Sequence, residues 1–296
     1  MNAIPAVDAD TLARSGDTVT AVVLAGGDAS DRIAREAGVD AKALLPIGDR
    51  PMGAYVLAAL RDCGAVRTIV YVGAASARLA PTYDVRVEAG ARFVDSLALG
   101  LGAAMAVTDG DPRARFLLLG ADVPWVTGAM LDRFLAAAST LATAHAESRT
   151  GPDLVYPVVP RDAAEAQFPH QRRTFVRLRD GSFTGGNVVL VRASVVARLL
   201  PLIDRVHRAR KNPAALAAIV GWDVLFSLLL GTASIAALER RVSRLLDAPA
   251  RALVTTDAAI AADVDRPAHV PGTAQDAMPG PAGSSGPASV SPWRTS

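Results

Sequence analysis

The sequence predicts an α/β protein with a three-layer α/β/α architecture and a mainly parallel central sheet. Short apolar runs rich in β-branched residues alternate along the chain with longer segments of helical periodicity. The apolar runs are not interrupted by alternating polar residues, which is typical of strands that are buried on both faces of a sheet. The chain has 296 residues, 51% of them hydrophobic, and this is enough to cover such a sheet on two sides.

The expected elements follow from these patterns. Residues 18–24 (TVTAVVL) form a β-branched run that ends in a glycine turn. Further strands are expected over residues 68–72, 85–88, 115–120, 153–159, 188–191 and 250–255. Apolar residues at helical spacing predict helices over 51–63, 93–107 and 127–141, with Thr127 as the cap of the last. The polar, arginine-rich stretch 161–180 is expected to be a loop with a hairpin around Asp180–Gly181.

One folded domain is expected over residues 18–268, with a helical insert at about 206–247. Residues 1–17 read as a flexible leader without the apolar core of a signal peptide. Residues 269–296 are rich in Pro, Gly and Ser and are expected to be a disordered tail. The longest apolar stretch, 216–238, is interrupted by Gly and polar residues, which favours a buried helical hairpin over a membrane span. We therefore expect a cytoplasmic protein with no stable membrane insertion.

Composition excludes several kinds of site. The net charge is +2, aromatic residues make up 5% of the chain, and no Lys or Arg run exceeds two residues, so a nucleic-acid groove is not expected. The single cysteine, Cys63, rules out an internal disulfide and a cysteine-based zinc site, and its apolar context favours a packing role. Only two of the 31 basic residues are lysines, Lys42 and Lys211. Lysines that are this rare are less expected to be surface residues without a specific role.

Two glycine-containing segments could approach a ligand closely. Leu24–Gly27 follows the first buried strand, where glycines let backbone N–H groups reach phosphate oxygens. Lys42 lies fifteen residues further on and could add a positive charge to the same phosphates. The alternative is an ordinary turn with a surface lysine. The segment Thr184–Asn187 (TGGN) either receives a ligand or forms a tight turn into the next strand.

Acidic residues suggest a site for a hard cation. Asp122 follows the strand 115–120, and ligands of parallel sheets bind at the carboxyl ends of the strands. Asp263 and Asp265 are two residues apart and would share a face if they lie on a strand. Mg²⁺ bound with a nucleotide usually takes one or two protein carboxylates. The alternatives are a turn or helix cap for Asp122 and a polar strand end for the pair.

Six segments together resemble one known family. Their order along the chain is similar to that of the MobA-like NTP transferases, which belong to a nucleotidyltransferase superfamily with the Rossmann-like fold of nucleotide-diphospho-sugar transferases. The resemblance extends over about residues 18–268. The segments are VVLAGG (Val22–Gly27), AKALLPIGDRPM (Ala41–Met52), DSLALGL (Asp95–Leu101), LLLGADVP (Leu117–Pro124), TGGN (Thr184–Asn187) and ADVDRP (Ala262–Pro267).

The resemblance implies roles for individual residues. Lys42 matches the lysine of the family, and Ser96 lies in a helix similar to one that packs against the base and ribose. Asp122 corresponds to the metal-binding aspartate, and Asp263 and Asp265 fall where a second metal ligand is expected. The residues implied to hold the nucleotide are Leu24, Ala25, Gly26 and Gly27, and those expected to bind the second substrate are Gly185, Gly186 and Asn187.

The sequence therefore predicts a Mg²⁺-dependent nucleotidyltransferase. It would move a nucleoside monophosphate from an NTP to a phosphorylated or hydroxyl acceptor with release of pyrophosphate, and its partners would be small molecules. Asp31 stands where the family usually has an arginine, which leaves open a regulator that binds nucleotide without catalysis. A membrane-associated scaffold that uses residues 216–238 is a third possibility.

Overall fold

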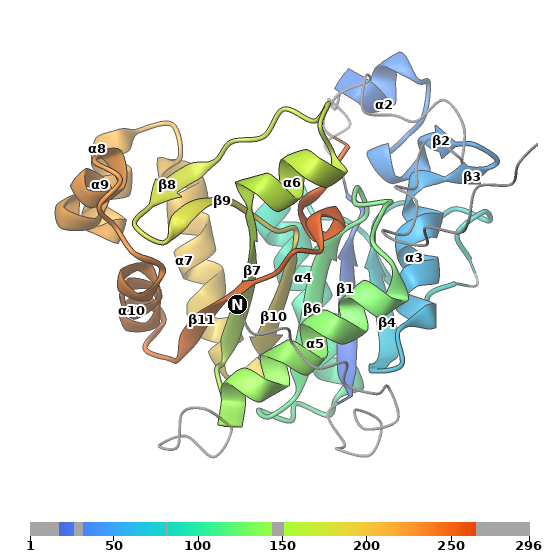
Figure 1. Ribbon diagram of the computed structural model, residues 1–296. Helices are drawn as coiled ribbons and strands as arrows, with labels where there is room; N and C mark the ends of the chain where they lie inside the picture. Colours follow the sequence, from blue (N-terminus) through green and yellow to red (C-terminus); the bar gives the residue numbers. More distant parts are fainter. Residues whose placement is uncertain (1–17, 27–31, 81, 144–150, 265–296) are drawn as a thin grey trace, which may run out of the picture.

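The computed structural model describes residues 18–26, 32–80, 82–143 and 151–264, and these residues form a mixed sheet with helices on both faces (Figure 1). The expected leader and tail lie outside the described residues. The sheet order is β5-β4-β1-β6-β10-β7-β9-β8, with β11 paired to β7. The strands are β1 (Val19–Leu24), β4 (Val66–Val72), β5 (Val85–Val87), β6 (Arg115–Gly120), β7 (Leu154–Pro160), β8 (Val176–Leu178), β9 (Gly181–Gly185), β10 (Val188–Arg192) and β11 (Ala250–Val254).

Strand direction confirms the predicted fold class. β1 is parallel to both β4 and β6, β4 is parallel to β5, and β7 is parallel to β11. β10 runs antiparallel to both β6 and β7, so these two strands point the same way. The hairpin of β8 and β9 pairs Leu178 with Gly181, as expected for a turn at Asp180–Gly181. The carboxyl ends of β1, β6 and β7 consequently meet at one edge of the sheet.

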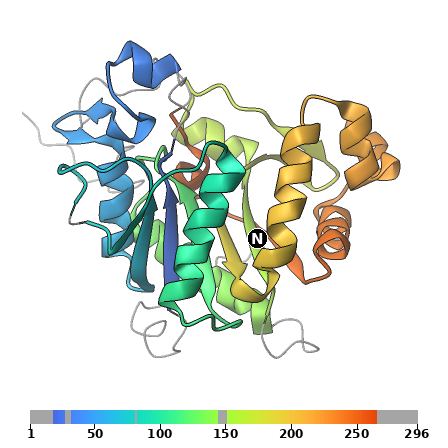
Figure 2. The same cartoon turned by 180° about the vertical axis from the view of Figure 1, so that it is seen from behind.

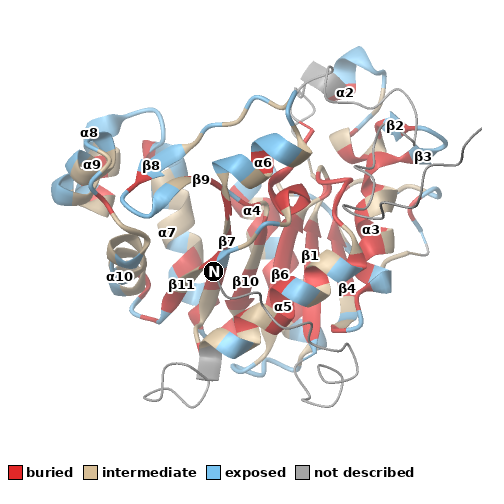
Figure 3. Ribbon diagram, viewed as in Figure 1, coloured by how far each residue is buried: buried red, intermediate tan, exposed pale blue. Residues whose placement is uncertain are grey.

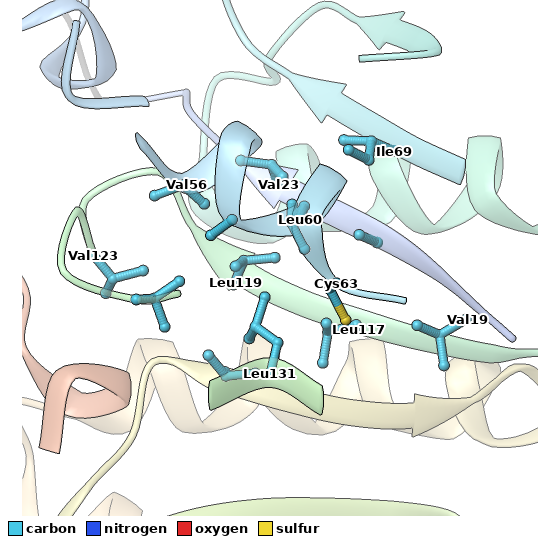
Figure 4. Packing of buried hydrophobic residues seen from close by; sticks show 14 of the residues in the cluster. Val19, Val23, Val56, Leu60, Cys63, Ile69, Leu117, Leu119, Val123 and Leu131 are labelled. Carbon is cyan, nitrogen blue, oxygen red and sulfur yellow. The ribbon is translucent and has the colours of Figure 1, made fainter. Parts of the chain in front are cut away.

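Helices cover both faces of the sheet. On one face, α3 (Met52–Asp62) and α5 (Gly128–Thr143) bury residues such as Leu60 and Leu131 against β1 and β6 (Figure 4). On the other face, α4 (Phe93–Val107) and α7 (Val196–Ala209) pack on the strands, as Figure 2 shows from behind. Figure 3 shows the central strands buried between these layers. The Thr127 hydroxyl accepts a hydrogen bond from the Met130 N–H at 3.4 Å, as expected of the cap of α5.

The contact between α4 and the sheet depends on one glycine. A Cβ atom added at Gly100 would lie 2.7 Å from Val22 Cγ1 and 2.7 Å from Val72 Cγ2, on the two central strands. The same addition at Gly102, on another side of the same helix, meets nothing within 4 Å.

This difference gives a matched pair of variants. Gly100→Ala is expected to lower the free energy of unfolding by about 1–3 kcal/mol, because the methyl group overpacks a rigid core. Gly102→Ala is expected to raise the same free energy by about 0.5–1 kcal/mol through helix propensity. Urea unfolding curves of the two variants distinguish these signs, and a stabilised Gly100→Ala variant would contradict the close packing of α4.

The polar stretch 161–180 contains a helix that the sequence analysis missed. Helix α6 (Arg161–Gln167) begins directly after Pro160 and has Asp162 in its first turn. Three alanines in seven residues give this segment a high helix propensity, and its arginine and acidic residues are compatible with an exposed helix face. The expectation of a loop from residue 161 was therefore wrong, whereas the segment after residue 167 up to β8 contains no helix or strand.

Residues 206–247 contain the end of α7 and three further helices, α8 (Pro213–Val220), α9 (Trp222–Leu229) and α10 (Ile235–Leu246). The predicted burial of the stretch 216–238 is wrong for α9, none of whose residues is buried, whereas Ala217, Ile219 and Ala233 are buried. Helix α9 ends before a turn at Gly231, and its large apolar residues Trp222, Phe226 and Leu229 are exposed. Within the described ranges, no helix is both long and apolar enough to cross a membrane.

Candidate active site

The predicted site residues come from segments that meet at the carboxyl edge of the sheet. Leu24 ends β1 and pairs with Gly120, which ends β6. Beyond these strands, the Ala25 N–H donates to the Val72 carbonyl (2.8 Å) and the Ala121 N–H donates to the Leu24 carbonyl (3.0 Å). The first residues of both loops are therefore fixed relative to one another.

Lys42 and Asp122 form an ion pair at this edge. Lys42 Nζ lies 2.9 Å from Asp122 Oδ2, and the two side chains are 14% and 30% exposed. Lys42 begins a 3-10 helix, η1 (Lys42–Leu44), whose Ala43 backbone lies against Gly53 at the start of α3. The lysine is thus not a surface residue, and the two residues to which the sequence analysis assigned catalysis are in direct contact.

Gly120 is a site residue that the sequence analysis did not single out. A Cβ atom at this position would lie 2.3 Å from Asp122 Oδ1, because the carboxylate folds back over the end of β6. Any residue other than glycine would place its Cβ in this space and displace the Asp122 carboxylate. The glycine two positions before the aspartate in LLLGADVP was the available signal.

The segment that follows β11 completes the same edge. Arg133 on α5 makes two hydrogen bonds to the Asp257 carboxylate, of 3.1 and 2.7 Å, and so holds the start of η3 (Ala258–Ala261). The Val264 N–H then donates to the Asp122 backbone carbonyl (2.9 Å). Residues 262–264 form no strand, so the condition under which Asp263 and Asp265 would share a face is not met at Asp263. Asp265 lies outside the described residues.

The TGGN segment is joined to this same stretch. Gly185 ends β9, and the Asn187 backbone N–H and side-chain amide donate to the carbonyls of Ile260 (2.8 Å) and Ala261 (3.2 Å). An added Cβ would lie 2.1 Å from Tyr156 Oη at Gly185 and 2.7 Å from Pro157 Cγ at Gly186. The glycines therefore serve close packing of the chain with itself, and Gly185 is also exposed.

Close packing also surrounds the glycine turn after β1. A Cβ at Gly26 would lie 2.4 Å from Ala89 Cβ and 3.4 Å from Ser96 Oγ. The buried Ser96 hydroxyl accepts a hydrogen bond from the Gly90 N–H (3.0 Å). Ser96 thus lies beside the glycine turn and fixes the loop that covers Gly26. Gly27 lies outside the described residues.

The oxygen donors at this edge fit a Mg²⁺ ion that is bound together with a nucleotide. Such an ion needs one or two protein carboxylates, since phosphates and water complete its shell, and the partly exposed Asp122 carboxylate offers hard oxygen ligands. Asp263 is adjacent, with Oδ1 3.5 Å from Nη2 of Arg173, whose side chain is 8% exposed. Among the described residues, no three His, Cys, Asp or Glu side chains are grouped.

Cys63 has the packing role expected of it. It is buried, and its thiol donates to Asp132 Oδ1 at 3.1 Å. Burial, and next the hydrogen bond to Asp132, raise the pKa of the Cys63 thiol to about 12. We therefore expect a thiol reagent at pH 8 to modify the native protein about 1000-fold more slowly than the denatured protein, since only the thiolate reacts. Because the chain has one cysteine, the absorbance trace of each state reports this thiol alone, and equal rates would show that the thiol is accessible.

Comparisons with known proteins identify a family and similar structures. The family model of the MobA-like NTP transferase domain matches residues 21–218. A hypothetical transferase from Thermus thermophilus is 38% identical with a TM-score of 0.71, and the alignment covers 86% of this chain and 99% of that chain. The 2-C-methyl-D-erythritol 4-phosphate cytidylyltransferase of the same organism is 17% identical with a TM-score of 0.47, covering 86% and 95%. Proteins of curated function gave no match.

The protein is therefore a nucleotidyltransferase with a Rossmann-like α/β fold. The matched region spans more than half of the sequence, and the chain belongs to the family of MobA-like NTP transferase domains.

Proposed function

We propose that this enzyme transfers a nucleoside monophosphate from an NTP to a phosphorylated or hydroxyl acceptor and depends on Mg²⁺. The observation that carries this proposal is the ion pair of Lys42 and Asp122, 2.9 Å apart at the carboxyl edge beside the glycine turn. It places a cation for phosphate oxygens next to a carboxylate for a metal, and both are needed by a reaction on a triphosphate.

In the proposed reaction an acceptor oxygen attacks the α-phosphorus of the NTP in line. The new phosphorus–oxygen bond forms as the bond to the bridging oxygen breaks, and pyrophosphate leaves with that electron pair. A hydroxyl acceptor would also lose its proton, whereas a phosphate acceptor has none to lose. Such a reaction depends mainly on the positioning of the reactants and on neutralisation of charge.

The residues of the edge divide these tasks. The backbone of Leu24–Gly27, supported by Ser96, is proposed to receive the nucleotide, and Lys42 offsets negative charge on its phosphates. Asp122 and one of Asp263 and Asp265 would hold Mg²⁺, which when bound supplies Lewis-acid charge stabilisation. The exposed turn at Gly185, with Gly186 and Asn187 behind it, is proposed to bind the acceptor. Because NTPs are cytoplasmic metabolites, we propose this localisation.

Pyrophosphate release tests the proposal directly. The full chain is incubated with each of the four NTPs and a panel of sugar phosphates and polyols, with Mg²⁺ or with EDTA. We expect release with at least one NTP and acceptor, and loss of release in EDTA. Nucleotide binding without pyrophosphate release from any pair would contradict transfer and favour a regulatory protein, while release that is undiminished by EDTA would contradict the metal.

Gly120 offers a finer test of how the carboxylate is positioned. Gly120→Ala is expected to lower kcat/KM about tenfold, because the added methyl group displaces Asp122 Oδ1 and small displacements at a reacting centre are costly. The control is Gly102→Ala, which changes a glycine with open space around it. Steady-state kinetics and melting curves of both variants are compared. An unchanged kcat/KM in a folded Gly120→Ala variant would show that turnover does not depend on the position of the Asp122 carboxylate.

A further inference from the structure

Helix α9 has an apolar stripe that faces solvent. Trp222, Phe226, Leu229 and Leu230 are 53%, 54%, 73% and 76% exposed. Their spacing of four, three and one residues puts them on one face of the helix and its last turn. The rings of Trp222 and Phe226 stack with centroids 5.9 Å apart. Four large apolar side chains gathered in nine residues are unlike the scattered exposed apolar residues of an ordinary surface.

The inner side of α9 is attached to the fold. Leu228 packs with the apolar cluster that includes Leu178, Phe183 and Ala233 and joins α9 to the hairpin of β8 and β9. The outer stripe therefore belongs to a fixed helix rather than to a loose segment. In Figure 1, α8 and α9 lie at one end of the molecule, and α2 (Arg32–Glu36) and α3 lie at the other.

The segment that carries the stripe has a surplus of positive charge. Residues 196–247 contain eight Lys or Arg and four Asp or Glu, although the whole chain is nearly balanced at 31 to 29. At the amino-terminal end of α9, Arg241 donates from Nη2 to the Ile219 carbonyl and lies near the exposed Asp223, and Arg177 lies at the other end, beside Gly231. Arg210 and Lys211 are exposed in the turn before α8.

We propose that α9 docks on a lipid surface with anionic head groups. An interfacial helix combines an apolar face, aromatic residues at the head-group level and basic residues at its flanks. Negative lipids complement the surplus of basic residues in the segment that carries the stripe. In a symmetric dimer through the same stripe, two copies would instead bring their positive surfaces together. The charge therefore selects the lipid surface over a second copy.

Vesicle sedimentation tests this docking. The full chain is mixed with vesicles of phosphatidylcholine alone or of phosphatidylcholine with phosphatidylglycerol, at low and at high salt. We expect the chain to pellet with the anionic vesicles at low salt, and to pellet less at high salt because salt screens the attraction. The double variant Leu229→Ser/Leu230→Ser should lose about tenfold or more in vesicle affinity.

Two control variants locate the effect. Leu99→Ser removes a leucine of α4 that is 47% exposed, and its vesicle affinity should equal that of the parent. Arg210→Gln/Lys211→Gln should weaken binding to anionic vesicles only. Melting curves confirm that each variant is folded, and pyrophosphate release is a separate readout. The proposal is overturned if the parent stays in the supernatant, if it binds both vesicle types equally, if the Leu229/Leu230 variant still pellets, or if light scattering finds a dimer through this stripe and no vesicle binding.

Discussion

Replacement of Asp122 by Asn is expected to reduce kcat/KM about 1000-fold while the fold is retained. Asn has nearly the same shape as Asp, and its amide oxygen can still accept a hydrogen bond from Lys42, which lies 2.9 Å from the carboxylate. What is lost is the negative charge that would hold Mg²⁺, and a metal acting as Lewis acid is worth several kcal/mol of transition-state stabilisation. Pyrophosphate release over a range of NTP and acceptor concentrations, at saturating Mg²⁺, measures the effect.

The control for this variant is Asp111→Asn, because Asp111 lies at the opposite, amino-terminal end of β6 and accepts a hydrogen bond from the Arg113 N–H. It should leave kcat/KM unchanged. Near-normal turnover of the Asp122→Asn variant at saturating Mg²⁺ would remove Asp122 from the site, whatever the outcome for the control.

The second large effect is expected at Lys42. Lys42→Arg should lose most of the activity, by about tenfold or more, although the charge is conserved. The lysine side chain is 14% exposed beside Asp122, and a planar guanidinium does not fit where a compact ammonium reaches both a carboxylate and phosphate oxygens. Lys42→Ala should be at least as inactive, and melting curves of both variants should still show a cooperative transition, which separates the loss of activity from a loss of folding.

Lys211→Arg provides the matched control, because Lys211 is the other lysine of the chain and is exposed in the turn before α8. Its kcat/KM should equal that of the parent. If the Lys42→Arg variant is equally active, Lys42 has no specific role towards phosphates and the ion pair with Asp122 serves structure alone.

The sequence predicted the central part of the fold because its signals there are local. β1 and β6 are continuous apolar runs, and α4 has both helical periodicity and the predicted bounds Phe93–Val107. The meeting of the loops after Leu24 and before Asp122 also followed, since the carboxyl ends of parallel strands share an edge. In this part of the chain, the positions of the strands in the sequence also determine which residues meet at the edge of the sheet.

Other features depend on contacts that no local pattern encodes. The ion pair joins residues 80 positions apart, and the need for glycine at residue 120 is visible only when the Asp122 carboxylate lies over it. The run 258–261 would suit a strand or a helix, and the lack of a neighbouring strand decides for η3. Similarly, the apolar residues of α9 gave no sign of which face the rest of the chain would cover.

The hydrogen bond from the Val264 N–H to the Asp122 carbonyl has a consequence for biosynthesis. It connects the end of β6 to a residue 142 positions later, across the whole insert of α8, α9 and α10. During translation, the strands up to β6 can associate before residue 264 leaves the ribosome. At that point the segment around Val264, which lies against Asp122, is not yet in place. Nucleotide-dependent turnover is therefore expected to appear only after residue 264 has left the ribosome, so that a nascent chain stalled before this residue would be folded in part and yet inactive.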